Sequence, residues 1–404
     1  MSKMAPQIRF QGFTDDWEER KLSDIGDIVT GNTPKTSNSL YYNGSFLFVS
    51  PADIQETRYI YKTNTTLTAA GFNTGRLVKT GSTLFVSIGS TIGKVAQAST
   101  DVITNQQINS IVPFKHYDNN FIYTSLVNIA KKIKTLAVTQ AVPIINKTEF
   151  SKNIIYVPDL QEQQKIGLFF KQLDDTIALH QRMLDLLKEQ KKGFLQKMFP
   201  KNGAKVPELR FSGFADDWEE RKLGELANIV GGGTPSTSNP EYWDGDIDWY
   251  APAEIGEQSY VSKSKKTITE LGLKKSSARI LPVGSVLFTS RAGIGNTAIL
   301  GKEATTNQGF QSIVPEQNKL DSYFIYSRTN ELKRYGEVTG AGSTFVEVSG
   351  KQMSKMSIMV PELSEQQQIG SFFNQLDNTI ALHQRMLDLL KEQKKGFLQK
   401  MFVS

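Results

Sequence analysis

Two long stretches of the chain place apolar residues at alternating steps of three and four positions, the a/d pattern of a coiled-coil helix. In the first stretch the pattern runs through Phe170, Leu173, Ile177, His180, Leu184, Leu187, Lys191, Phe194 and Met198. In the second it runs through Phe373, Leu376, Ile380, His383, Leu387, Leu390, Lys394, Phe397 and Met401. Because such a stripe must be removed from water, each predicted helix needs a partner for its seam.

The starts of both helices resemble capping boxes, in which the third helical side chain bonds back to the cap. Asp159 with Glu162 fits this pattern in the first stretch, and Ser364 with Gln367 fits it in the second. If the helices end near Met198 and Met401, a rise of about 1.5 Å per residue makes each about 57 Å long. Helices of this length exceed those of an ordinary globular domain.

Two arrangements could bury the seams. Each helix could pack on its own domain, or the helices could pair with each other, and two seams of equal length favour pairing. Both parallel and antiparallel pairing are possible, because some 150 residues separate the helices. His180, Lys191, His383 and Lys394 interrupt the seams, and polar residues there usually fix register and orientation.

The chain is a tandem duplication. Residues 6–22 (PQIRFQGFTDDWEERKL) return as residues 207–223 (PELRFSGFADDWEERKL), and residues 157–167 return as residues 360–370. Residues 176–199 and residues 379–402 are identical. The distance between matching residues grows from 201 at the first repeat to 203 at the second, so the two variable bodies differ in length by a small net insertion.

Between these markers the halves agree only in short stretches. GNTPKTSN matches GGTPSTSN, SPADI matches APAEI, and TNQQINSIVP matches TNQGFQSIVP. Runs such as SFLFVS, GSTLFVSI and GSVLFTS combine β-branched and aromatic residues between glycines, which predicts strands. Each half is therefore expected to contain a compact α/β domain of about 140 residues, with one scaffold carrying two different surfaces.

Composition narrows the function classes. The chain has 404 residues, no cysteine and three histidines, His116, His180 and His383, which do not cluster, so a metal centre is not expected. The net charge of +6 and the pI near 9.1 permit a nucleic-acid partner without requiring one. Neither a signal peptide nor a run of about 18 apolar residues is present, which predicts a cytoplasmic protein without a membrane anchor.

The order of variable body, constant helix, variable body and constant helix resembles the specificity subunit of type I DNA restriction-modification enzymes. A TP-containing loop opens each body, and a P-x-L-x-E-Q-Q segment enters each helix. The resemblance covers essentially the whole chain and depends on this layout rather than on any single motif.

The resemblance implies a mixed α+β fold with two α/β target recognition domains, separated by two long helices in an antiparallel coiled coil with pseudo-two-fold symmetry. It implies that each domain reads one half of a split sequence in double-stranded DNA. Two methyltransferase subunits would dock on the helices and methylate adenine with S-adenosylmethionine, while two restriction subunits would add translocation and cleavage with ATP and Mg. The chain itself would bind no cofactor and perform no chemistry.

On this interpretation the chain divides into four segments. Residues 1–157 and 201–360 would form the recognition domains, with a short linker at residues 200–208, and residues 158–200 and 361–404 would form the helices. An antiparallel pair of equal helices would match the dyad of duplex DNA and would set the distance between the half-sites.

Polar and basic side chains on glycine-rich loops are the candidate DNA contacts, because Arg and Lys match guanine and Asn and Gln match adenine. In the first domain the candidates are Lys35, Ser87, Ser90, Thr91, Lys94, Asn105, Gln106 and Gln107. In the second they are Ser290, Arg291, Asn296, Asn307, Gln308, Ser343 and Thr344. Arg291 aligns with Ile88 or Gly89, and the Asn and Gln residues that both halves share are more typical of scaffold.

Two other functions remain open at this point. An enzyme is disfavoured, because the N-P-E-Y segment at Asn239 departs from a methyltransferase motif and the segment from Gly89 to Lys94 is one residue short of a P-loop. A non-catalytic assembly protein with two protein- or sugar-binding domains is the main alternative. Its sugar site would use aromatic residues, namely Tyr41, Tyr42, Tyr242 and Trp243.

Overall fold

The computed structural model describes residues 4–137, 143–201, 203–256, 258–291, 293–340 and 347–403. The chain divides into two compact units. Unit 1 contains residues 1–183 and 383–404, and unit 2 contains residues 184–382. The two longest helices, α5 (Leu160–Lys197) and α11 (Leu363–Lys400), each contribute residues to both units. No described helix has the length and hydropathy required to cross a membrane.

In the domain of unit 1 the described residues form three sheets and several helices. A two-stranded sheet pairs β1 (Glu18–Lys21) with β11 (Ile154–Val157). A five-stranded sheet has the order β2 (Gly26–Thr30), β10 (Ile108–Pro113), β7 (Thr83–Val86), β8 (Val95–Ala98), β4 (Tyr59–Ile60). A four-stranded sheet has the order β5 (Thr65–Leu67), β3 (Tyr42–Val49), β9 (Val102–Thr104), β6 (Leu77–Val78).

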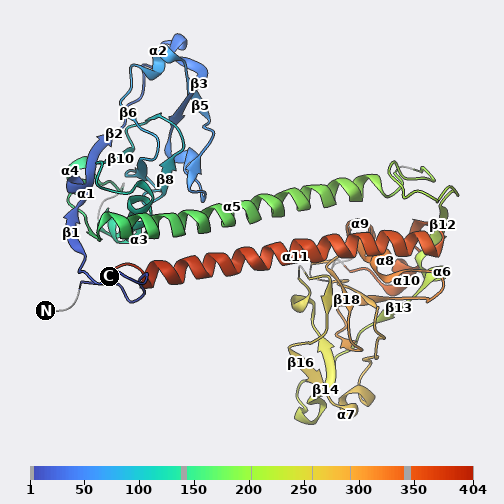
Figure 1. Cartoon of the computed structure of the whole chain (residues 1–404). Coiled ribbons are helices and arrows are strands. Elements are labelled where there is room, and N and C mark those ends of the chain that lie inside the picture. The colour runs from blue at the N-terminus through green and yellow to red at the C-terminus, as the bar shows by residue number, and fades with distance from the viewer. Residues whose placement is uncertain are drawn as a thin grey trace. The chain divides into compact units, whose positions relative to one another are not determined.

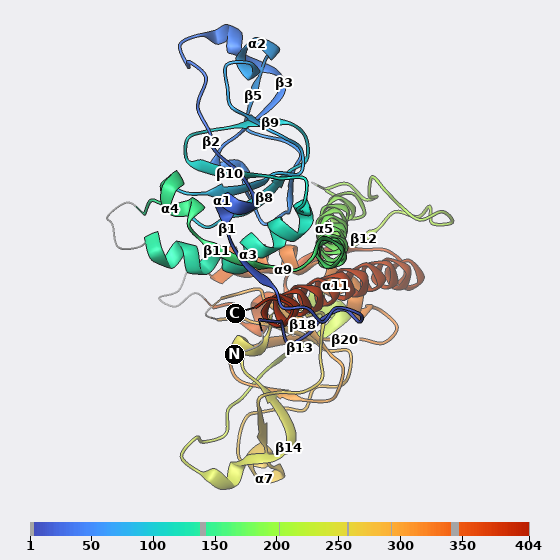
Figure 2. The same ribbon diagram turned by 60° about the vertical axis from the view of Figure 1, so that its left-hand side comes forward.

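Its helices are α1 (Leu22–Ile25), α2 (Ala69–Phe72), α3 (Asn119–Ala137) and α4 (Lys147–Ser151). Strands β3 and β5 with α2 form the part of this domain that lies farthest from α5 (Figure 1, Figure 2). Predicted strands in SFLFVS and GSTLFVSI are confirmed as parts of β3 and β7.

Unit 2 repeats this plan. β12 (Glu219–Lys222) pairs with β21 (Ser357–Val360). The five-stranded sheet has the order β13 (Ala227–Gly231), β20 (Gln311–Pro315), β17 (Val286–Phe288), β18 (Thr297–Leu300), β15 (Tyr260–Val261). A three-stranded sheet has the order β16 (Lys266–Ile268), β14 (Trp243–Tyr250), β19 (Thr305–Thr306). The helices are α6 (Leu223–Leu226), α7 (Glu270–Lys274), α8 (Ser322–Ser327), α9 (Thr329–Gly340) and α10 (Gly350–Ser354).

None of the residues of the predicted seams is exposed on either long helix. In unit 1 the rings of Phe169 and Phe397 lie 5.1 Å apart, and Nδ1 of His180 lies 3.0 Å from Nδ1 of His383. As residue numbers rise along α5 they fall along α11, so the two segments are antiparallel. In unit 2 Lys191 pairs with Asp377 and Phe194 contacts Phe372. Residue numbers again rise along α5 as they fall along α11, so these segments are antiparallel too.

Each long helix also packs on a domain core, so the two arrangements considered from the sequence are combined. In unit 1 the ring of Phe402, just after α11, lies 5.8 Å from Phe121 and 6.0 Å from Trp17. In unit 2 Phe199, just after α5, lies 5.7 Å from Phe324 and 6.1 Å from Trp218. A domain core is therefore completed by the end of the helix that the other half of the sequence supplies.

The predicted capping boxes are wrong in detail. Asp159 does cap α5, since its Oδ1 accepts a bond of 2.9 Å from the Glu162 backbone N–H, but the Glu162 carboxylate is bound by Arg9 instead. In α11 the cap lies two residues earlier than predicted, because Ser364 is already helical and donates to Glu362. Arg210 binds the buried Glu365 in the same way that Arg9 binds Glu162, so these carboxylates join each domain to its helix.

Candidate nucleic-acid interface

Two loops that both halves share are bonded to each other in each unit. In unit 1 the Asn32 N–H donates to the Thr104 carbonyl over 2.9 Å, and Thr33 Oγ1 donates to Gln106 Oε1 over 2.7 Å. In unit 2 the Gly233 N–H donates to Thr306, and Thr234 donates to Gln308. The TP-containing loop (residues 31–38 and 232–239) and the TNQ loop (residues 104–107 and 306–309) therefore form one surface in each domain.

The first glycine of the TP-containing loop is required by close packing. A Cβ on Gly31 would lie 2.2 Å from the Asn105 carbonyl oxygen, and one on Gly232 would lie 2.0 Å from the Asn307 carbonyl oxygen. No side chain fits at such distances, which explains why both halves carry glycine at this position.

Asn105 and Asn307 shape the TNQ loop from within. Oδ1 of Asn105 accepts from the Gln107 N–H over 3.0 Å, and Oδ1 of Asn307 accepts from the Gly309 N–H over 2.7 Å. Nδ2 of Asn105 also donates to the Gln107 side chain over 3.1 Å. These bonds hold both asparagine side chains against their own loop, which supports a scaffold role for the shared residues.

The four aromatic residues proposed for a sugar site are half-buried, and two of them bond to the TP-containing loop. The Tyr42 hydroxyl donates to the Pro34 carbonyl over 2.7 Å, and Trp243 Nε1 donates to the Ser236 carbonyl over 3.1 Å. Asn239 accepts from the Glu241 N–H and so caps a short 3-10 helix. The N-P-E-Y segment therefore has a local structural role.

Ser87 and Ser290 do not belong with the candidate DNA contacts, because both are buried. Ser87 directly follows β7, and its hydroxyl accepts a bond of 2.8 Å from Asn109 inside the domain. The sequence could not distinguish a strand that continues inward from the start of an exposed loop. Beyond these serines the loops turn outward, with left-handed backbone at Gly89 (φ 96°) and Gly293 (φ 99°).

The remaining candidates differ in exposure. Lys35, Ser90, Gln106, Arg291, Asn296 and Gln308 are exposed, whereas Thr91, Lys94, Asn105, Gln107 and Asn307 are half-buried. The Lys94 ammonium donates to the Ile54 carbonyl over 3.2 Å. Ser343 and Thr344 lie outside the described residues.

The structure resolves the alignment of Arg291, which corresponds to Ile88 rather than to Gly89. Ile88 forms an isolated antiparallel β-bridge with Ile144, and Arg291 forms one with Glu347. Arg291 Nη2 lies 2.7 Å from Glu347 Oε1, and both side chains are partly exposed. The same place on the scaffold thus carries an aliphatic pair in one domain and an ion pair in the other.

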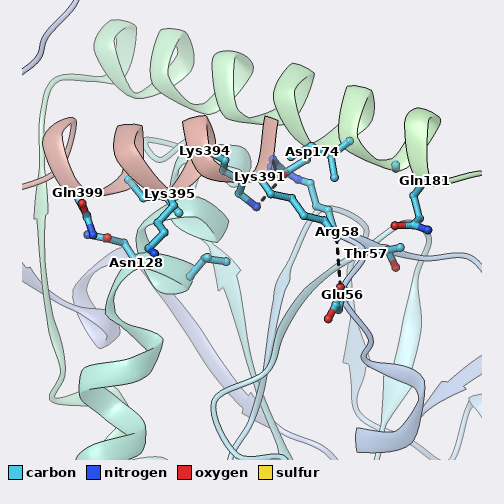
Figure 3. A pocket seen from close by; sticks show the side chains of 14 residues that line it. Glu56, Thr57, Arg58, Asn128, Asp174, Gln181, Lys391, Lys394, Lys395 and Gln399 are labelled. Atoms are coloured by element: carbon cyan, nitrogen blue, oxygen red, sulfur yellow. Dashed lines mark hydrogen bonds and ion pairs between the residues drawn. The ribbon is translucent and has the colours of Figure 1, made fainter. Parts of the chain in front are cut away.

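A basic cavity of about 410 Å³ lies in unit 1 between the domain and the two long helices (Figure 3). Arg58 on its wall is nearly fully buried and donates to Asp174 of α5 over 3.1 Å, to Gln97 over 2.8 Å and to Asn120 over 2.8 Å. Lys394 of α11 lies 2.6 Å from the same Asp174. The buried carboxylate therefore joins all three parts of unit 1.

Unit 2 satisfies the matching carboxylate differently. Lys191 Nζ lies 2.5 Å from Asp377 Oδ1, while the Tyr323 hydroxyl donates to Asp377 Oδ2 over 2.9 Å. Burial raises the pKa of Tyr323, so the hydroxyl remains a donor. Sequence reasoning missed both networks. The available signal was an aspartate two residues before each identical segment begins, at matching positions.

Among the described residues no group of three or more His, Asp or Glu side chains is placed to hold a metal ion. The surfaces that vary between the domains are instead loops with polar and basic side chains on a common frame. Such a frame is suited to binding an extended polar partner.

Comparison with known proteins shows what the chain resembles. The chain is 36% identical over 179 residues to the type I restriction enzyme MjaIX specificity subunit of Methanocaldococcus jannaschii, an alignment that covers 44% of this chain and 41% of that relative. It is 24% identical over 411 residues to the putative MjaX specificity subunit of the same organism, covering 95% of this chain and 92% of the relative. It is 30% identical over 167 residues to the EcoR124I/EcoR124II specificity subunit of Escherichia coli, covering 39% of this chain and 41% of that protein.

The fold has a counterpart among solved structures. The crystal structure of a type I restriction-modification S subunit from M. genitalium matches 99% of this chain and 100% of that chain with a TM-score of 0.68 and 16% identity. The family model for the type I restriction modification DNA specificity domain matches residues 14–189 and again residues 215–392. Because these two matches together span most of the sequence, the chain belongs to the type I restriction modification DNA specificity domain family and carries two copies of that domain.

Proposed function

We propose that the chain is the DNA-specificity subunit of a type I restriction-modification complex and that each domain reads one half of a bipartite target. One observation carries this proposal: the same backbone bonds hold the TP-containing and TNQ loops in both units, while the side chains presented at matched places differ. Arg291 against Ile88 is the clearest such difference. A constant frame with variable exposed side chains is what reading two different half-sites requires.

The paired helices support a spacing role. In unit 1 α5 and α11 are antiparallel through Asp174–Lys394 and His180–His383, and in unit 2 they are antiparallel through Lys191–Asp377. An antiparallel pair of matching helices has an approximate two-fold axis, and duplex DNA has a dyad. We propose that the helices hold the two domains at a fixed distance along the DNA.

The identical parts of the helices provide a surface for two copies of one partner. Leu179, Met183 and Leu186 follow helical spacing on α5 and are 58%, 39% and 51% exposed. Their copies on α11, Leu382, Met386 and Leu389, are 57%, 39% and 52% exposed. Exposed apolar stripes of this kind mark interaction sites, and their duplication fits two equivalent methyltransferase subunits.

The proposal assigns chemistry to the partners. Adenine methylation with S-adenosylmethionine would occur on the methyltransferase subunits, and ATP- and Mg-dependent translocation and cleavage on two restriction subunits, in the cytoplasm where the DNA lies. This chain would contribute recognition, spacing and assembly, and would bind none of these cofactors itself.

A map of methylated adenines in the DNA of the host tests the function. We expect methylation within a split motif that has a fixed gap, and loss of that methylation when this chain is deleted. The paired change Leu186→Asp with Leu389→Asp should also abolish methylation, because a charge in each apolar stripe prevents docking. The matched pair Gln190→Asp with Gln393→Asp adds the same charge at exposed positions nearby and should retain it. Methylation that persists without this chain would contradict the proposal.

The spacing role predicts the effect of longer helices. Seven residues inserted after Met183 and again after Met386 preserve the seam and add about 10.5 Å to each helix at about 1.5 Å per residue. We expect the gap between the half-sites to grow by up to about three base pairs, since B-DNA rises about 3.4 Å per base pair. The same seven residues inserted beside Gly203 in the linker should leave the gap unchanged. A gap that stays unchanged when both helices are lengthened would disprove the spacing role.

A further inference from the structure

The β-bridge after Ser87 and Ser290 is built in the same way in both domains. The Ser87 N–H donates to Gln107 and the Ser290 N–H donates to Gly309, each over 2.8 Å. On the other side, the Ile145 N–H donates to Ser87 over 2.9 Å and the Val348 N–H donates to Ser290 over 3.2 Å. The intervening residues, Ile88 with Ile144 and Arg291 with Glu347, therefore occupy equivalent places.

The side chains at these places are accessible. Ile144 is 41% exposed, and the Arg291 and Glu347 side chains are 47% and 32% exposed. Each loop then passes a helix that carries a lysine at the point of approach, Lys134 of α3 in unit 1 and Lys333 of α9 in unit 2. A Cβ on Gly93 would lie 3.3 Å from the Lys134 Cβ, and one on Gly295 would lie 2.4 Å from the Lys333 Cβ. Both lysines are exposed, so the bridge pair lies next to a surface suited to phosphate groups.

The ion pair leaves Arg291 able to read a base. The contact with Glu347 involves Nη2, and a guanidinium has five N–H donors in a planar fork. An arginine that a carboxylate holds in place can present its remaining donors to O6 and N7 of guanine in the major groove. An aliphatic pair has no donor or acceptor, and its natural base partner is the methyl group of thymine.

We propose that this bridge is a base-reading position in each domain, with Arg291 reading a guanine in one half-site and Ile88 with Ile144 contacting a thymine methyl in the other. The inference rests on the proposed function, since it specifies what that function reads. Glu347 acts as a positioning residue that holds the guanidinium toward the base.

The test uses the whole complex with its methyltransferase subunits, and reads both the methylation map and binding to a duplex that carries the native motif. Arg291→Ala should relax a guanine requirement at one position in one half-site and weaken binding on the order of 10- to 100-fold. Glu347→Gln should weaken binding less and keep the guanine preference. The exposed Arg279, elsewhere in the same domain, provides the control Arg279→Ala, which should leave the motif unchanged.

The reciprocal change completes the test. Ile88→Arg with Ile144→Glu should change one position of the other half-site only, from a preference for thymine to one for guanine. If the native map shows a split motif but Arg291→Ala leaves every position unchanged, the inference is wrong and the proposed function stands. If the native complex shows no split motif at all, the proposed function itself fails.

Discussion

Replacing Asp174 by alanine is expected to destabilise unit 1 by about 3–5 kcal/mol, the range for removing one partner of a buried ion pair. The Asp174 side chain is 8% exposed and Arg58 is 2% exposed. Without the carboxylate, the guanidinium keeps neutral partners in Gln97 and Asn120 but no opposite charge, and Lys394 loses its partner as well. Denaturant unfolding of the purified chain, with a probe in unit 1, measures the loss.

The neighbouring residue provides a matched control. Asp175 pairs with Lys171 over 2.7 Å on the surface, and such pairs contribute about 0–1 kcal/mol. Asp175→Ala should therefore leave unit 1 nearly as stable as the native chain. Adding Arg58→Met to Asp174→Ala should recover part of the lost stability, because it removes the unpaired charge. Equal stabilities for Asp174→Ala and Asp175→Ala would contradict this account of the network.

The sequence predicted the parts of the fold that follow from a regular or repeated pattern of residues. The seams of α5 and α11 follow from steps of three and four residues, and every predicted seam position is at least partly buried. The duplication was visible because residues 176–199 repeat without change. The helix starts were less accurate, because Arg9 takes the Glu162 carboxylate that a capping box would have used and comes from a distant segment.

The candidate site was harder to predict, because it depends on burial and on contacts between residues that are distant in the sequence. Ser87 and Ser290 are residues of a type common in loops, but both are buried inside the domain. The Arg58–Asp174 pair joins residues far apart in sequence and has no arginine at the matching place in the other half. The place of Arg291 could be assigned only from its β-bridge with Glu347, because the sequence alignment alone allowed two positions for it.

The central claim is that each body reads its own half-site on a symmetric frame. A chain in which residues 23–157 are replaced by residues 224–360 tests it, because the shared RKL and VP segments provide matching junctions. The new body should pack correctly, because Ile166, Phe170 and Asp174 of α5 recur as Ile369, Phe373 and Asp377 of α11. Such a subunit carries the second body twice.

Under the proposed function, antiparallel helices would place the two identical bodies about a two-fold axis, so their half-sites should be inverted repeats. The gap should stay close to the native one, since the helices are unchanged. A matched chain with the first body twice should give the inverted repeat of the other half.

The most direct measurement is therefore the map of methylated adenines in DNA modified by the complex that contains the subunit with two second bodies. We expect an inverted repeat of the second half-site at the native gap, with the first half-site absent. A map that retains the first half-site, or one that shows the second half-site as a direct repeat, would contradict the account.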